Sequence, residues 1–193
     1  MTKIIGLTGG IGSGKTTIAN YLKSLGIPVY IADDEAKKVM QLPEIVTQIK
    51  LEFGENVFVN DLINTSKLAK LVFNNPEKLK QLNKIVHPAV KEHFDNWVLQ
   101  HKDFPFVIKE AAILFESGSY QYCDKIITVI APIETRIKRV INRDKTSREN
   151  VLDRINSQWT DEQKTSKSDF VITNISFDDA KNQVDKIINL LSN

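Results

Sequence analysis

The stretch that decides the fold is Gly9-Gly10-Ile11-Gly12-Ser13-Gly14-Lys15-Thr16, which fits the phosphate-binding pattern G-x-x-x-x-G-K-[ST]. Glycines let backbone N–H groups curl around phosphate oxygens, because a residue without a Cβ tolerates positive φ. Lys15 is placed to reach the β- and γ-phosphates of a nucleoside triphosphate, and the Thr16 hydroxyl is placed to bind Mg²⁺. The helix that follows would point its positive end at the anion.

The residues on either side of this loop predict a strand before it and a helix after it. Lys3–Thr8 is a short apolar run that leads directly into the loop, which is typical of a buried strand and not of a signal peptide. After the loop, Ile18, Leu22 and Leu25 recur at helical spacing. The alternative is a glycine-rich turn that binds nothing, but such a turn has no need of a Lys-Thr pair directly behind its glycines.

Composition narrows the class of protein. A chain of 193 residues can bury one sizeable core, and a formal charge of +2 argues against a protein that coats nucleic acid. Its one cysteine, Cys123, cannot form an internal disulfide, which fits a reducing cytoplasmic location. No apolar run approaches the roughly 20 residues that span a bilayer. We therefore expect a cytoplasmic protein without nucleic-acid or membrane partners, either monomeric or weakly self-associating.

Five apolar runs separated by helical stretches predict a parallel sheet covered on both faces: 4–8, 29–32, 106–111, 125–130 and 170–173. The expected fold class is α/β, a P-loop three-layer sandwich with a five-stranded parallel sheet. Residues 1–33 and 103–193 would form the nucleotide-binding core, and 34–102 a helical insertion that binds the acceptor. Within the insertion, Pro43, Pro76 and Pro88 are each placed to open a helix.

Asp33 is the candidate general base. It follows the second apolar run, at the sheet edge where a substrate hydroxyl would approach the loop. A carboxylate there can orient the hydroxyl and take its proton during phosphoryl transfer. The alternative is that Asp33 caps the next helix, a role that the neighbouring Asp34 also suits.

A basic stretch after the fourth run predicts a lid, at about 134–165. Residues 134–148 contain six basic side chains against two acidic ones. Arginines that close over a γ-phosphate stabilise the charge that spreads over it and exclude water. We expect this role for Arg139, Arg143 and Arg148. A solvated helix face is the alternative, and we expect it for Arg136 and Lys138.

Two further polar residues are candidates for the site. Glu110 interrupts an apolar strand, and a buried charge is costly unless it is used. It could hold a magnesium-bound water, or it could be a partner for Lys109 or Lys15. His87 precedes Pro88 in the insertion, where it could contact a ligand or pack at a junction between helices.

Taken in order, these motifs resemble the dephospho-CoA kinase family nearly end to end. The matching stretches are Leu7–Thr16, Ala32-Asp33, Val86-His87-Pro88, Ile113-Leu114-Phe115-Glu116, Lys138-Arg139, Asn142-Arg143-Asp144, Ser147-Arg148-Glu149 and Phe170–Asn174. The chain departs from the family pattern at three positions, where Ile31 stands for the usual Asp, Ala112 for Pro and Glu110 for the commoner Asp.

The resemblance implies ATP-dependent phosphorylation of the ribose 3′-hydroxyl of dephospho-CoA, the final step of coenzyme A synthesis, on a fold similar to nucleoside monophosphate kinases. It implies Asp33 as base, Lys15 and Arg139 as catalytic phosphate clamps, and Thr16 as the Mg²⁺ ligand. ATP would contact Gly10, Ile11, Gly12, Ser13, Gly14, Lys15, Thr16, Thr17, Arg143, Asn174 and Ile175. The acceptor would contact Thr8, Asp33, His87, Glu110, Arg139 and Arg148.

Two rival functions follow from the loop alone. One is a different small-molecule or nucleotide kinase, which only the acceptor-side residues argue against. The other is a GTP-dependent switch, but Asn83-Lys84 is followed by Ile85-Val86 and so lacks the carboxylate that reads guanine in N-K-x-D.

Overall fold

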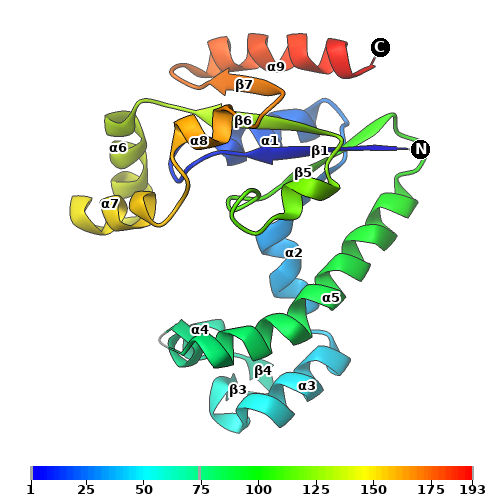
Figure 1. The fold of residues 1–193 in the computed structure, drawn as a ribbon, viewed down its shortest axis with the longest axis vertical. Helices are drawn as coiled ribbons and strands as arrows, with labels where there is room; N and C mark the ends of the chain where they lie inside the picture. Colours follow the sequence, from blue (N-terminus) through cyan, green and yellow to red (C-terminus); the bar gives the residue numbers. More distant parts are fainter. Residues whose placement is uncertain (1, 74, 193) are drawn as a thin grey trace. The chain divides into compact units, whose positions relative to one another are not determined.

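The computed structural model describes residues 2–73 and 75–192. Its contacts divide the chain into two compact units. The first combines Met1–Ile31 with His101–Asn193 and contains the whole phosphate-binding loop, and the second is Ala32–Gln100. Figure 1 shows the strands of the large sheet in the first unit and mostly helices in the second.

The first unit is built on a five-stranded sheet in which every neighbouring pair is parallel. The strands follow the spatial order β2-β5-β1-β6-β7 and comprise β1 (Lys3–Thr8), β2 (Val29–Ile31), β5 (Phe106–Glu110), β6 (Lys125–Ile130) and β7 (Phe170–Thr173). The α/β fold and the five strands predicted from the sequence are confirmed. Because β1 is the central strand, the loop that follows it emerges at the middle of the sheet's carboxyl edge.

Side chains alternate between the two faces of this sheet. Ile5 and Leu7 of β1 pack in one apolar cluster with α1 (Lys15–Ser24) and α9 (Phe177–Ser192), and Figure 1 shows α9 beside β7. Gly6 points to the opposite face, where a Cβ would come within 2.7 Å of the Leu114 side chain. The segment after β5, with the 3₁₀ helix η2 (Ser119–Tyr122), therefore packs closely on that face.

The basic stretch forms two helices that pack on each other, α6 (Ile133–Asp144) and α7 (Arg148–Asn156). Their contact is the apolar cluster of Ile137, Val140 and Val151. A short helix, α8 (Asp161–Thr165), follows and contacts β6. Thr160 caps α8 in a complete capping box with Gln163, so the connection between α7 and α8 ends in a fixed conformation.

The second unit has an apolar core of its own, which includes Ile49, Leu68 and Val86. Its elements are α2 (Ala32–Val39), α3 (Pro43–Phe53), the 3₁₀ helix η1 (Glu55–Val57), the antiparallel strands β3 (Phe58–Val59) and β4 (Leu62–Ile63), α4 (Thr65–Phe73) and α5 (Pro76–Gln100). The small hairpin was not predicted from the sequence.

The prediction that Pro88 opens a helix is wrong, because Pro88 lies inside the 25-residue helix α5. A proline there removes one helical hydrogen bond and normally kinks or ends a helix. The flanking residues Val86 and Ala89 both pack into the core of the second unit, and this tertiary packing keeps the helix continuous. Pro43 and Pro76 do begin helices, as predicted.

Among the residues that the structure describes, no helix is both long enough and apolar enough to cross a membrane.

Candidate active site

The phosphate-binding loop has the backbone that its glycines predict. Gly9, Gly12 and Gly14 have φ of 149°, 77° and 98°, which side-chain-bearing residues rarely adopt. Gly14 is the N-cap of α1, and no side chain caps this helix and no acidic residue stands in its first turn. The start of α1 thus carries no acidic side chain that would repel an anion, and the positive end of a helix favours anion binding.

Arg139 and Asn174 donate hydrogen bonds to main-chain carbonyls of the loop. One guanidinium nitrogen of Arg139 donates to the carbonyls of Gly12 and Ser13 at 3.4 and 3.3 Å, and the other donates to the carbonyl of Asn174 at 3.2 Å. The buried Asn174 side chain donates to the Ser13 carbonyl at 2.8 Å. A Cβ on Gly14 would overlap the Asn174 amide, which is a second reason for glycine there. Ile175, in contrast, is 64% exposed.

The expectation that Arg136 lies on a solvated helix face is wrong. Arg136 is only 5% exposed, and its Nε donates to the carbonyl of Ile11 at 2.9 Å. Its terminal nitrogen forms an ion pair with Asp161 at 3.0 Å. A signal was available in the sequence, since Arg136 stands three residues before Arg139 and so shares its face of the helix. Lys138 is exposed, as predicted.

Arg143 and Arg148 are exposed and paired with carboxylates of the same helical segment. Arg143 donates to both oxygens of Asp144, and Arg148 to both oxygens of Glu134. The hydrogen bond from Arg143, joined by one from Arg154, lowers the pKa of Asp144 to about 2. A nucleotide that bound Arg143 or Arg148 would have to replace these carboxylates. Both of these arginines donate to carboxylates, whereas Arg139 donates to the loop and to Asn174.

Two residues are expected near a metal, Thr16 and Glu110, and they lie on the same face of the sheet. Thr16 and Thr17 are exposed in the first turn of α1. Glu110 is 6% exposed and pairs in register with Leu7, near the start of the loop. Its side chain lies on the same face of the sheet as that of Ile108, two residues earlier, which faces α1. A hydroxyl and a carboxylate are the hard oxygen ligands that Mg²⁺ prefers, so these residues fit a magnesium ion that is also bound by phosphate.

Thr8 ends β1 on the opposite face of the sheet from Leu7. Its hydroxyl is fully buried and donates to the carbonyl of Ala112 at 3.4 Å. That carbonyl also accepts from Lys164, so Ala112, where the family usually has proline, is held through its main chain.

Asp33 and Asp34 lie in the first turn of α2, in the second unit, and both are exposed. Because α2 already begins at Ala32, neither aspartate is the N-cap that the alternative interpretation required. Asp33 comes two residues after Ile31, the last residue of β2, which pairs in register with Glu110.

His87 is not at a junction between helices, since it lies within α5 and is exposed. The second unit carries a groove of about 470 Å³ between α3 and α5, lined by residues that include Lys84, Pro88 and His93. His87 is not among the lining residues, whereas His93 is one of them. His93 lies about one and two-thirds turns further along α5, which places it on another face of the helix from His87.

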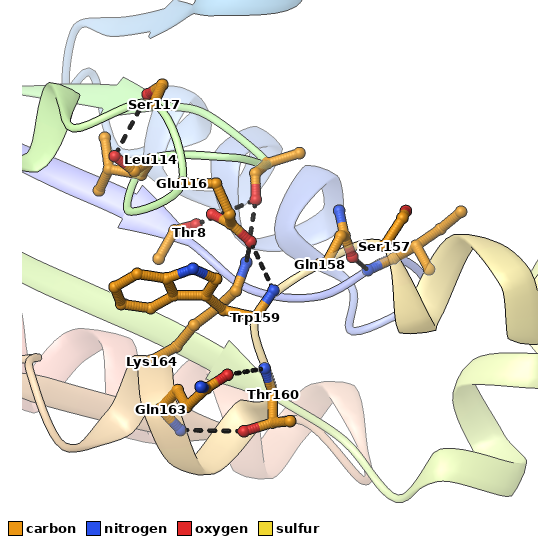
Figure 2. Close-up of polar contacts among 12 residues, drawn as sticks. Thr8, Leu114, Glu116, Ser117, Ser157, Gln158, Trp159, Thr160, Gln163 and Lys164 are labelled. Atoms are coloured by element: carbon orange, nitrogen blue, oxygen red, sulfur yellow. Dashed lines mark hydrogen bonds and ion pairs between the residues drawn. The ribbon is translucent and has the colours of Figure 1, made fainter.

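A buried ion pair behind the loop was missed entirely from the sequence (Figure 2). The Lys164 side chain is fully buried, and its Nζ lies 2.9 Å from Glu116 Oε1 and 3.1 Å from the Ala112 carbonyl. The same carboxylate oxygen accepts from the main-chain N–H of Trp159 at 2.8 Å, and the Trp159 ring stacks on Phe115 with 5.6 Å between centroids. Burial raises the pKa of Glu116, but the hydrogen bonds from Lys164 and Trp159 outweigh it, so the pKa lies below its ordinary value.

Comparison with known proteins assigns this architecture. The family model described as dephospho-CoA kinase matches residues 3–179. The chain belongs to the dephospho-CoA kinase family. A curated dephospho-CoA kinase of Bacteroides fragilis is 41% identical over 190 residues, which cover 97% of this chain and 91% of that protein.

Two solved structures agree with this family assignment. The Thermus thermophilus protein TT1252 superposes with a TM-score of 0.90 at 35% identity, covering 98% of this chain and 97% of that one. The dephospho-CoA kinase of Campylobacter jejuni gives a TM-score of 0.73 at 30% identity, covering 100% and 98%. The membership predicted from the motifs is confirmed, and with it the activity of a dephospho-CoA kinase, which uses ATP in the final step of coenzyme A synthesis.

Proposed function

We propose that ATP binds at the loop as its Mg²⁺ complex and that the γ-phosphoryl group passes to the ribose 3′-hydroxyl of dephospho-CoA. The observation that supports this most directly is the uncapped start of α1 at Lys15, whose N–H groups have no carboxylate in the first turn to compete with phosphate. In the transfer, the bond between the acceptor oxygen and γ-phosphorus forms, the bond to the β-phosphate oxygen breaks, and ADP leaves.

Lys15 and Arg139 would stabilise the negative charge that spreads over the γ-phosphoryl oxygens during transfer. Thr16 would bind Mg²⁺ directly, and Glu110 would hold one of its water ligands. A Mg²⁺ ion held there would neutralise part of the negative charge on the phosphates. The Arg139 contacts to the Gly12 and Ser13 carbonyls support this role, because they keep the guanidinium at the loop before any nucleotide arrives.

Asp33 would accept the proton of the attacking hydroxyl. Its carboxylate is exposed and no hydrogen bond within the first turn of α2 needs it as a cap, so it is available to a substrate. We assign the acceptor to the second unit, where the groove between α3 and α5 has the size of a small-molecule site. The one cysteine fits a cytoplasmic location, and we expect a monomer in solution.

Steady-state kinetics with Asp33→Asn tests the assignment of the base. The variant should bind ATP like the parent and lose about 10²–10⁴-fold in kcat, the usual contribution of a general base. Asp34→Asn is the matched control, since it changes the neighbouring carboxylate and should keep nearly full activity. Normal turnover by Asp33→Asn would show that Asp33 is not the general base. Phosphorylation of nucleoside monophosphates in preference to dephospho-CoA would show that the proposed acceptor is wrong.

A further inference from the structure

Ile11, in the middle of the phosphate-binding loop, is held by the segment 133–165 rather than by the rest of the loop. Its side chain packs against the apolar cluster of Ile137, Val140 and Val151, which joins α6 to α7. The loop residue with the largest apolar side chain is thus partly buried against the cluster that joins the two helices. Any shift of these helices changes the surroundings of Ile11.

Both polar main-chain atoms of Ile11 are bound by the same segment. The N–H donates to the side-chain oxygen of Gln158 at 2.9 Å, and the carbonyl accepts from Nε of Arg136 at 2.9 Å. Together these two bonds fix the plane of both peptide groups that flank Ile11. A Cβ on Gly10 would overlap the Arg136 guanidinium, so this guanidinium lies directly against the loop backbone.

The two side chains that bind Ile11 are themselves held in place. Arg136 is paired with Asp161, the first residue of α8. Gln158 precedes Trp159, whose N–H donates to Glu116 and whose ring stacks on Phe115. Figure 2 shows Gln158 and Trp159 on one connection, with one carboxylate oxygen of Glu116 joined to both Trp159 and Lys164. Side chains fixed in this way can impose a geometry on a glycine-rich loop that would otherwise adopt many.

We propose that Gln158 and Arg136 are positioning residues that set the ATP-binding conformation of the loop through Ile11. This inference rests on the proposed binding of ATP phosphates at the loop. Neither side chain needs to touch ATP for this. When the Gln158 bond is lost, the loop populates other conformations. The affinity for ATP then falls in proportion to the fraction of molecules whose loop still has the ATP-binding conformation.

Equilibrium binding of ATP and Mg²⁺ without acceptor tests the proposal. Gln158→Met keeps the length of the side chain but removes the acceptor for the Ile11 N–H. Its Kd for ATP should rise roughly tenfold, equivalent to about 1.4 kcal/mol. At saturating ATP the kcat and the KM for dephospho-CoA should stay within about twofold, because the reacting groups are unchanged. Gln121→Met, at an exposed position of η2, is the matched control and should bind ATP like the parent.

Amide hydrogen exchange gives a second readout that general destabilisation does not mimic. In Gln158→Met the Ile11 amide should lose protection while the amides of β1 keep theirs. If Gln158→Met folds poorly, Arg136→Lys takes its place, because it keeps the charge but cannot bind the Ile11 carbonyl and Asp161 as the guanidinium does. ATP affinity should again fall roughly tenfold.

Lys15→Ala separates this inference from the proposed function. If Lys15→Ala loses ATP binding but Gln158→Met and Arg136→Lys both bind ATP like the parent, the positioning role is wrong and the loop assignment stands. If Lys15→Ala itself binds ATP normally, the proposed function fails. A drop in melting temperature with unchanged ATP affinity would also overturn the positioning role.

Discussion

Replacing Lys164 with methionine should lower the free energy of unfolding in a way that depends on pH. Lys164 is fully buried, and its ammonium group neutralises a carboxylate whose other oxygen, Glu116 Oε2, is buried without a partner among the described residues. Methionine fills nearly the same space but leaves this carboxylate with main-chain donors alone, the N–H groups of Trp159 and of Glu116 itself. The Ala112 carbonyl loses the Lys164 ammonium as well.

The magnitude at pH 7 is bounded by the cost of protonating the stranded carboxyl. Each unit between the pH and an ordinary glutamate pKa of about 4.3 costs about 1.36 kcal/mol, so the bound is about 3.7 kcal/mol at pH 7 and about 1 kcal/mol at pH 5. The hydrogen bond lost at Ala112 adds about 1 kcal/mol at either pH. Because the Glu116 side chain is 17% exposed, hydration relieves part of the first cost. We expect a total loss of about 3–4 kcal/mol at pH 7 and about 2 kcal/mol at pH 5.

The sign follows from the pKa of Glu116 in the two proteins. In the parent, the pKa of Glu116 lies below its ordinary value. The stabilisation is therefore present at every pH above the ordinary pKa of a glutamate, and it is lost only as the pH falls through the lowered pKa. The pair therefore contributes fully from pH 5 to 8. In the variant, burial without the ammonium raises the pKa of Glu116. The loss in the free energy of unfolding therefore grows from pH 5 to pH 8 because the carboxyl of the variant, and not that of the parent, titrates in this range.

Urea unfolding followed by circular dichroism at pH 5, 7 and 8 measures the loss by linear extrapolation. Glu116→Gln is the matched control, because it strands the buried Lys164 ammonium and leaves no carboxyl to titrate. It should cost about 3–5 kcal/mol, the usual cost of breaking a buried pair, and this loss should not grow from pH 5 to pH 8, because a stranded ammonium is costliest at low pH. A Lys164→Met loss that is equal at pH 5 and pH 8, or below about 1 kcal/mol at both, would refute the reasoning.

Two further predictions concern the thiol and the loop glycines. Burial raises the pKa of the Cys123 thiol to about 11, so this thiol, the only one in the chain, should react with a disulfide reagent at pH 8 on the order of 10²-fold more slowly in the native protein than in denaturant; equal rates would contradict its burial. Gly12→Ala should lose about 1–2 kcal/mol of stability from its positive φ, and more from overlap with the Arg136 backbone, in a thermal melt. An unchanged melting temperature would show that the loop relaxes freely.

The parallel sheet and the phosphate loop could be predicted because their signals are local. Each strand is a short apolar run, and the loop needs glycines at fixed spacing directly before Lys15 and Thr16. The hairpin of β3 and β4 was missed although Asn60 and Asp61 carry a turn signal, with φ of 51° and 60°, because each strand is only two residues long. A run that short shows no alternation.

Which charged side chains are buried, and which residues they pair with, could not be predicted as well from the sequence. Arg136 and Lys138 stand two positions apart in one basic stretch, yet one is buried against the loop and the other is exposed. Lys164 follows two acidic residues in a short helix and reads as a surface lysine, but it is fully buried against Glu116, 48 positions earlier. His87 matched a family motif, and its contact with the acceptor stays a prediction, since it is not among the residues that line the groove beside Pro88.

The sequence by itself determined the five strands of the parallel sheet, the loop that binds phosphate and the family, since these depend on residue type and spacing along the chain. Only the tertiary structure decided what surrounds the loop. Arg136, Gln158 and Asn174 reach Ile11 and Ser13 from more than 120 positions away, through hydrogen bonds that no local pattern encodes. A buried charge or amide is stable only where folding supplies its partner, and which residues become partners depends on how the elements pack.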